Sequence, residues 1–293
     1  MQDLSYRIQA IGARAFMQMF RMLPLDVASW FGGWVARTLG PLTGAHKTAV
    51  KNLALAMPEF NEAVRAKMII DMWDNIGRTV GEYPHLGKLI NDTKRVEVDD
   101  PANITVKLRD DGIGAVMIGL HFGNWELGTV PGYRAGLKQY HFYRAPNNPY
   151  VDAMLMDLRK SMQQEGFLPK GAEGARQAVG LLKKHMHITM LVDQKQDEGI
   201  AAPFFGRDAM TTTAPATLAR RFNLPIVAAR IIRQNGARFK VQVQEFHITK
   251  TDDRQADIIT TTQQINALLE NWVREYPAQW FWVHRRWPRD GRG

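Results

Sequence analysis

The sequence predicts an α/β protein with a mostly parallel central sheet flanked by helices and an α-helical N-terminal region. Residues 1–90 carry apolar side chains at helical spacing, which predicts helices. From Val96 onward, short apolar runs alternate with amphipathic segments, which is typical of a sheet covered by helices. No linker rich in Pro, Gly and Ser divides the 293 residues, so we expect residues 41–293 to form a single domain after an N-terminal segment, residues 1–40.

The individual elements follow from the local pattern. Ala115–Leu120 is continuously apolar, which predicts a buried parallel strand. Asn235-Gly236 predicts a hairpin turn between the last two strands. Further strands are predicted at Tyr140–Tyr143, Ile188–Val192, Leu224–Ile232 and Arg238–Phe246. Helices are predicted at Val50–Ala56, Glu62–Gly81, Pro149–Gln164, Ala175–Lys184, Thr212–Phe222 and Asp257–Tyr276.

Composition restricts the chemistry. The net charge of +9 favours anionic partners such as nucleic acid, acidic lipid, a phosphorylated substrate or an acidic carrier protein. The absence of Cys excludes disulfides, thiolate metal sites and a cysteine nucleophile. None of the three Ser lies in a G-x-S-x-G motif, and no phosphate-binding G-x-x-x-x-G-K-[ST] motif occurs. We expect no metal site.

The first 23 residues are amphipathic. Leu4, Ile8 and Ile11 recur at helical spacing, and Arg residues at 7, 14 and 21 share another face. No stretch reaches the roughly 18 apolar residues typical of a spanning helix. Two interpretations remain open, an interfacial membrane helix or a helix packed on the protein's own core. We expect residues 1–40 to associate with a membrane.

The most informative segment is His121-Phe122-Gly123-Asn124-Trp125-Glu126, which directly follows the apolar strand. Ligands of α/β sheets bind at the carboxyl ends of the strands. With His121 in the turn and Glu126 in a first helical turn, the carboxylate would hold one imidazole nitrogen while the other accepts a proton. The alternative is a structural histidine beside a Glu that is favoured by a helix N-terminus.

The His121-x₄-Glu126 spacing resembles the H-x₄-[DE] motif of the glycerolipid acyltransferase superfamily. The wider pattern looks like the bacterial lipid A biosynthesis late acyltransferases. The segments that carry this resemblance, spread over nearly the whole chain, are Asn52–Glu59, His121–Glu126, Tyr143–Pro149, Asp193-Gln194, Pro203–Gly206 and Gln279–Trp287.

The resemblance implies a glycerolipid acyltransferase-like fold at the cytoplasmic face of the cell inner membrane, peripheral or weakly anchored. It implies transfer of a fatty acyl chain to a hydroxyl of a lipid A precursor. The donor would be acyl carrier protein or another acyl thioester such as acyl-CoA, with no cofactor. The expected partners are therefore acyl carrier protein, the lipid A precursor and inner-membrane lipids, with no nucleic acid.

His121 is expected to act as general base with Glu126 as its orienting carboxylate. The other candidates are expected to bind substrate, and most have a structural alternative. For Arg159 this is a solvated helix position, for Asn148 an N-cap, for Asp193 and Gln194 turn formation, and for Phe205 a buried aromatic pair. The full set of expected substrate-binding residues is Arg144, Arg159, Asn148, Asp193, Gln194, Phe205 and Gly206.

Three Trp residues near the C-terminus, Trp280, Trp282 and Trp287, are expected to be packing residues or interfacial anchors. Two other functions remain alternatives. One is an acyl-thioester or ester hydrolase that uses the same His and Glu to activate water. The other is a basic nucleic-acid-binding protein, although the basic residues are dispersed and no binding motif accompanies them.

Overall fold

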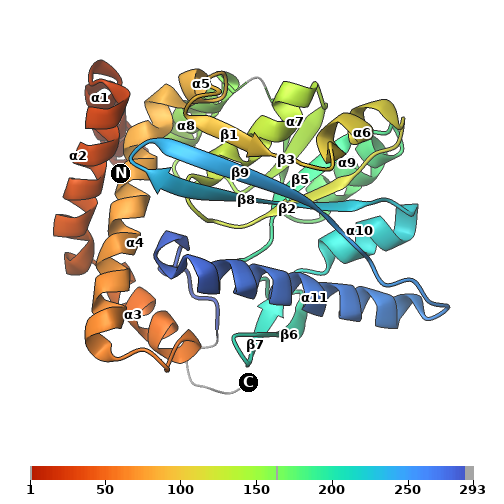
Figure 1. Ribbon diagram of the computed structural model, residues 1–293. Coiled ribbons are helices and arrows are strands. Elements are labelled where there is room, and N and C mark those ends of the chain that lie inside the picture. Colours follow the sequence, from red (N-terminus) through yellow and green to blue (C-terminus); the bar gives the residue numbers. More distant parts are fainter. Residues whose placement is uncertain (1, 163, 288–293) are drawn as a thin grey trace.

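The computed structural model describes residues 2–162 and 164–287. A seven-stranded sheet with the order β1-β9-β8-β2-β5-β3-β4 forms its centre (Figure 1). All neighbouring strands are parallel except β8 and β9, which form an antiparallel pair. The strands are β1 (Val96–Asp99), β2 (Val116–Gly119), β3 (Gln139–Tyr143), β4 (Gly166–Pro169), β5 (His187–Leu191), β8 (Ile226–Asn235) and β9 (Arg238–Phe246). A separate hairpin consists of β6 (Ile200–Phe204) and β7 (Arg207–Thr211).

Helices cover both faces of the sheet. Met117 and Val227 face α6 and α7, whereas Val116 and Ile118 face α9, α10 and α11. The helices are α1 (Gln2–Met22), α2 (Leu25–Leu39), α3 (Gly44–Ala56), α4 (Glu62–Glu82), α5 (Leu86–Leu89), α6 (Ile104–Asp110), α7 (Val130–Ala135), α8 (Pro149–Lys160), α9 (Ala172–Leu182), α10 (Ala214–Phe222) and α11 (Arg254–Glu275). Short 3₁₀ helices are η1 (Gly40–Leu42), η2 (Tyr83–His85), η3 (Trp125–Thr129) and η4 (Pro277–Gln279).

The predicted fold class is confirmed, including the helical region at the N-terminus and the hairpin at Asn235-Gly236. The helix predicted at Pro149–Gln164 is shorter than expected and ends at Lys160. The sequence did not predict the four-residue strands β1 and β4 at the edges of the sheet, nor the β6–β7 hairpin. Short edge strands carry little periodic signal, and their pairing is decided by neighbours distant in sequence.

Helices α2 and α4 pack with their backbones in close contact. A Cβ on Gly32 would lie 2.2 Å from the carbonyl oxygen of Gly77, and a Cβ on Gly81 would lie 2.3 Å from that of Ala28. Only glycine permits this approach, because any side chain at these positions would separate the helices. The opposite face of α2 points toward solvent, and Trp30 and Trp34 are exposed on it.

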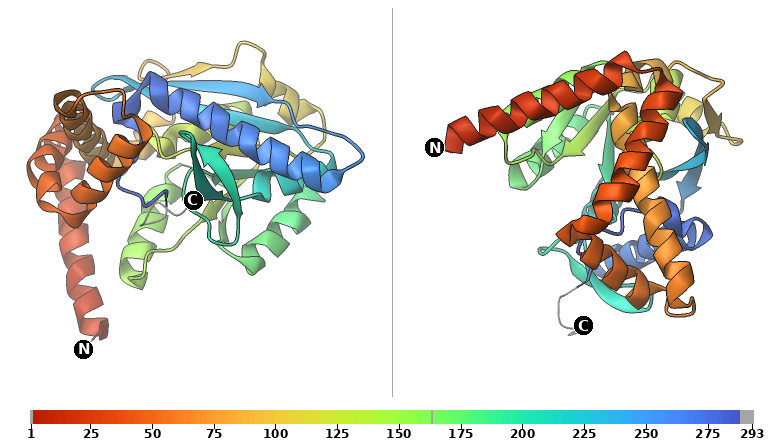
Figure 2. Two further views of the ribbon diagram at one scale, coloured as in Figure 1. Left: turned by 90° about the horizontal axis from the view of Figure 1, so that it is seen from below. Right: turned by 90° about the vertical axis from the view of Figure 1, so that its left-hand side faces the viewer.

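Helix α1 contacts α8, and its N-terminal end projects from the rest of the molecule in both views of Figure 2. Its predicted apolar stripe is not packed on the core, since Leu4, Ile8 and Ile11 are 64%, 62% and 67% exposed. Core packing is therefore the wrong interpretation for these three residues, whereas Phe20, near the other end of α1, is fully buried. Within residues 2–162 and 164–287, no helix is both long and apolar enough to cross a membrane.

Candidate active site

His121 and Asp193 lie together at the carboxyl edge of the sheet. The parallel register of β2 and β5 aligns Gly119 with Leu191, and each of the two residues follows its strand by the same two positions. Asp193 Oδ1 is 2.8 Å from Nδ1 of His121, and Asp193 Oδ2 accepts a hydrogen bond from the His121 backbone N–H at 3.0 Å. The imidazole is thereby fixed in position by a residue from the neighbouring strand.

The electrostatics favour an ionised Asp193. Its carboxylate also accepts a hydrogen bond from Nε1 of Trp280 at 2.8 Å and is almost fully buried. Burial alone raises the pKa of Asp193, but the adjacent His121 and the N–H donors outweigh burial and lower the pKa to about 2. A carboxylate at Nδ1 leaves Nε2 of the neutral ring as the proton acceptor.

The second imidazole nitrogen, Nε2, has no carboxylate partner among the described residues. The His121 side chain is 20% exposed, and its ring lies against the rings of Trp125 and Phe281. Nε2 of Gln194 lies 3.5 Å from Nε2 of His121, which is at the limit of a hydrogen bond. A hydroxyl that reaches this nitrogen would meet a base whose ring contacts the side chains of Trp125 and Phe281.

Among the described residues, Glu126 makes no hydrogen bond or ion pair with His121, so the expected orienting contact between the two is not formed. Both of its oxygens are occupied by Arg159, at 2.9 and 2.5 Å, and the hydroxyl of Tyr83 donates to Oε1 at 2.6 Å. The physical reason is that η3, which begins at Trp125, directs Glu126 toward α8 and away from β5. Whether Glu126 takes part in catalysis by another route stays a prediction.

The Glu126–Arg159 ion pair is buried. Burial raises the pKa of Glu126, yet the hydrogen bond and charge of Arg159 outweigh it and hold the pKa below its ordinary value. The guanidinium also lies over the ring of Tyr143. The alternative of a solvated position for Arg159 is therefore wrong, because its side chain is 13% exposed and tied to the segment that carries His121.

The remaining predicted residues near α8 divide into two groups. Arg144 is exposed in the loop after β3, at the same edge of the sheet as His121. Asn148 caps α8, where its Oδ1 accepts from the backbone N–H groups of Tyr150 and Val151. Its Nδ2 donates to the carbonyl oxygen of Tyr6 on α1. The capping alternative is thus confirmed for Asn148, and a substrate-binding role remains untested.

Comparison with known proteins supports the resemblance that the motifs indicated. The family model described as bacterial lipid A biosynthesis acyltransferase matches residues 2–289. The chain is similar to the lipid A biosynthesis palmitoleoyltransferase of Escherichia coli (strain K12), with 26% identity over 275 residues, 90% of this chain and 86% of the relative.

Two further relatives give a similar result. The lipid A biosynthesis acyltransferase of Shigella flexneri shows the same 26% identity over 275 residues, with the same coverage of 90% and 86%. The lipid A biosynthesis lauroyltransferase of Escherichia coli (strain K12) is 24% identical over 254 residues, which cover 82% of this chain and 78% of the relative.

The chain belongs to the bacterial lipid A biosynthesis acyltransferase family. The expected enzyme class, an O-acyltransferase of the lipid A biosynthesis type, is confirmed with it. Within this acyltransferase, the structure brings together His121, Asp193 and Gln194, and it pairs Glu126 of the following turn with Arg159.

The structure does not bring Phe205 and Gly206 to the acyltransferase's histidine. Both lie at the turn of the β6–β7 hairpin, with φ of +53° and +67°. They line an open cavity of about 910 Å³ between α3, the hairpin and α11, and His121 and Asp193 are not among its lining residues. Phe205 packs against the rings of Phe204, Trp282 and Trp287. The alternative of a buried aromatic pair is confirmed.

Sequence reasoning missed Tyr83 and the part that Trp280 takes in the site. Trp280, Trp282 and Trp287 are all buried, so the interfacial-anchor interpretation of these residues is wrong. Burial raises the pKa of Tyr83 well above its ordinary value, so its hydroxyl keeps its proton and donates to Glu126. No local signal marks Tyr83, because it lies 43 residues from Glu126 and meets it only through the packing of α4 and η2.

Proposed function

We propose that the protein transfers a fatty acyl chain from an acyl thioester, carried by acyl carrier protein, to a hydroxyl of a lipid A precursor. His121 is the general base and Asp193 orients it. The observation that carries this proposal is the 2.8 Å contact between Asp193 Oδ1 and His121 Nδ1, which leaves Nε2, 3.5 Å from Gln194, as the nitrogen that can accept the proton of a substrate hydroxyl.

The reaction is a direct transfer between donor and acceptor. Nε2 of His121 accepts the proton of the acceptor hydroxyl while the hydroxyl oxygen attacks the thioester carbonyl carbon. The tetrahedral intermediate collapses with cleavage of the carbon–sulfur bond, and the proton returns from His121 to the leaving thiolate. Asp193 stabilises the imidazolium that forms between these two steps. No side-chain nucleophile is needed, which agrees with a sequence that lacks Cys and any elbow-type Ser.

A two-part assay tests the reaction. Purified protein is mixed with acyl carrier protein that bears a radiolabelled acyl chain, with and without lipid A precursor. Both the free thiol of the carrier and the acylated lipid are measured. Acceptor-dependent thiol release that matches acylated product supports transfer. Thiol release of equal rate without acceptor would make the protein a hydrolase. Acyl-CoA as the donor in a parallel reaction distinguishes the two thioesters.

We also infer that residues 1–40 attach the enzyme to the cytoplasmic face of the inner membrane. The exposed stripe of α1 and the exposed Trp30 and Trp34 of α2 supply apolar side chains. Arg14 and Arg21 supply positive charge beside the stripe, whereas Arg7 is paired with Asp3 and lies over the ring of Tyr150. A peripheral attachment of this kind brings the site to an acceptor whose acyl chains lie in the bilayer. Sedimentation with vesicles of anionic or neutral lipid tests it.

A further inference from the structure

A single buried carboxylate joins three parts of the fold next to the active site. Glu82, the last residue of α4, is fully buried. Its Oε1 accepts hydrogen bonds from Oγ of Ser29 at 2.7 Å and from Nη1 of Arg233, and its Oε2 accepts from Nη2 of Arg233 at 3.0 Å. The fourth donor is Nδ2 of Asn124, 2.9 Å from Oε2. Helix α2, strand β8 and the turn after β2 therefore meet on one side chain.

Asn124 is the part of this network that reaches the site. It lies between His121 and Glu126 and is the residue from which η3 starts, since its carbonyl oxygen accepts the hydrogen bond of Leu127 N–H at 3.0 Å. Among the described residues, Oδ1 of Asn124 has no hydrogen-bond partner, so Glu82 alone holds its side-chain amide. This bond therefore ties the start of the helical turn that carries Glu126 to Glu82.

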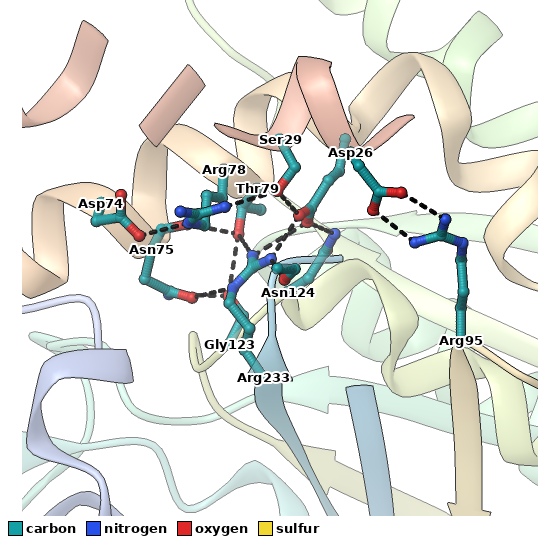
Figure 3. A network of polar contacts seen from close by, with 12 residues as sticks. Asp26, Ser29, Asp74, Asn75, Arg78, Thr79, Arg95, Gly123, Asn124 and Arg233 are labelled. Atoms are coloured by element: carbon teal, nitrogen blue, oxygen red, sulfur yellow. Dashed lines mark hydrogen bonds and ion pairs between the residues drawn. The ribbon is translucent and has the colours of Figure 1, made fainter. Parts of the chain in front are cut away.

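Arg233 acts on the same turn by a second route. Its Nε donates to Oδ1 of Asn75 at 2.8 Å, and its Nη2 donates to Oγ1 of Thr79 at 3.0 Å. Asn75 Nδ2 in turn donates to the carbonyl oxygen of Gly123 at 3.1 Å. The one hydroxyl proton of Thr79 is shared between that oxygen, at 3.1 Å, and the carbonyl oxygen of Asn75, at 3.0 Å. Figure 3 shows Arg233 rising from its strand between Asn75, Thr79 and Asn124.

The backbone at Gly123 has little freedom to compensate. Its φ is +57°, and a Cβ there would lie 2.0 Å from the carbonyl oxygen of Ile231. Its N–H donates to the carbonyl oxygen of Gln279 at 3.0 Å. The turn is therefore held on one side by the C-terminal segment and on the other by the side chains that Glu82 and Arg233 orient.

We infer that Glu82 and Arg233 are positioning residues for the catalytic turn, and that Asn124 is the link through which Glu82 acts. This inference rests on the proposed function, because it treats His121 as the base. The pair does not touch substrate. It fixes the path of residues 121–126, so that His121 and Glu126 keep their places relative to each other while donor and acceptor bind at His121.

Asn124→Ala and Ser29→Ala form a matched pair of variants. Each residue is fully buried, and each substitution removes one neutral donor from the same carboxylate, but only Asn124 belongs to the turn. Asn124→Ala should lower kcat about 10- to 100-fold with the KM for the acyl donor unchanged, since small misplacements of reacting groups carry penalties of this size. Ser29→Ala should lose comparable stability in urea and keep a kcat close to wild type.

A second pair covers the case in which Asn124→Ala does not fold. Thr79→Val removes a donor to Gly123, whereas Thr262→Val removes a buried Thr hydroxyl of α11 that, among the described residues, bonds only the carbonyl oxygen of Ile258 in its own helix. Thr79→Val should lower kcat and Thr262→Val should not. All rates are measured with detergent-dispersed acceptor, far below the unfolding midpoint and per folded enzyme.

His121→Ala distinguishes a failure of the proposed function from a failure of the positioning role. If His121→Ala retains turnover, the proposed function fails. The positioning role is tested with His121→Ala inactive. If both members of a variant pair, Asn124→Ala with Ser29→Ala or Thr79→Val with Thr262→Val, then lose kcat in proportion to their loss of stability, the positioning role is overturned. The network is in that case structural only.

Discussion

Asp193 holds Nδ1 of His121 at 2.8 Å although 72 residues separate the two in the chain. The parallel pairing of β2 with β5 is sufficient to explain the contact, because it aligns the residues that follow each strand. The contact supports our proposal that Asp193 has the orienting role that the H-x₄-E spacing had suggested for Glu126. Two kinds of variant test this assignment, one at the imidazole and one at the carboxylate.

His121→Ala should reduce turnover by roughly 10²–10⁴, the usual contribution of a general base. Asp193→Asn should approach the same loss, because an amide can donate to Nδ1 and so favour the wrong tautomer. Since the two residues act as a unit, the double variant should be no slower than His121→Ala alone. Trp280→Phe is the control, because it removes the indole donor to Asp193 and leaves the contact between Asp193 and the imidazole of His121 in place. Additive losses in the double variant would argue against a coupled pair.

Glu126→Gln should destabilise the fold by about 3–5 kcal/mol, because it leaves the buried guanidinium of Arg159 without its counter-charge. The free energy of unfolding in urea measures this. The sequence also predicts a large fall in kcat with modest change in acceptor binding. The double substitution Glu126→Leu with Arg159→Met should regain stability but not turnover. Recovery of both would make the ion pair a structural element with no part in the reaction.

Arg144→Ala should weaken the use of the phosphorylated acceptor or the acidic carrier. Arg144 is exposed at the edge of the sheet where His121 lies. A charge-assisted hydrogen bond to a bound anion contributes about 1.5–3 kcal/mol, which corresponds to a rise in KM of roughly 10- to 150-fold. Lys160→Ala is the control, because Lys160 is an exposed residue of α8 paired with Asp157. Equal kinetics for both variants would remove Arg144 from the site.

Replacing Leu4, Ile8 and Ile11 together by Ser should release the enzyme from anionic vesicles, with a fall in partitioning of at least about tenfold. The exposed Gln18→Ser on the same helix is the control. Arg14→Glu with Arg21→Glu should also release it, but mainly at low salt, because the charge contribution is screened and the apolar one is not. If the triple variant still sediments fully with vesicles, α1 is not the attachment site.

The stability of the protein should fall as the pH drops from about 6.5 toward 4. Burial lowers the pKa of His141 to about 4, so the folded state holds this ring neutral while the unfolded chain binds a proton. The stabilisation is fully present above the unfolded pKa of about 6.5 and is lost as the pH approaches the folded value. Urea unfolding at pH 7.5 and pH 5 should differ by about 2 kcal/mol on account of His141 alone.

His141→Phe should reduce this pH dependence by that amount. Ile265→Val, which trims a buried side chain of α11 and keeps the titrating group and its surroundings, should lower stability equally at both pH values. An unchanged difference between pH 7.5 and pH 5 in His141→Phe would show that His141 is not responsible for it.

The sequence by itself determined the fold class, because continuous apolar runs such as Ala115–Leu120 have a parallel, doubly covered strand as their natural structure. It also placed His121 at a strand end, and its motifs identified the family. These features are local or are repeated along the chain, so they can be read without knowledge of the contacts.

Only the tertiary structure decided which groups His121 and Glu126 contact. The five-residue spacing between them suggested a pair. Instead, the register of β2 with β5 brings His121 into contact with Asp193, and the packing of α8 brings Arg159 into contact with Glu126. The same holds for α1, whose stripe fits burial or exposure equally well until the neighbouring helices are in place. Contacts between residues distant in sequence depend on how whole strands pair and whole helices pack. A local sequence pattern does not specify that pairing and packing.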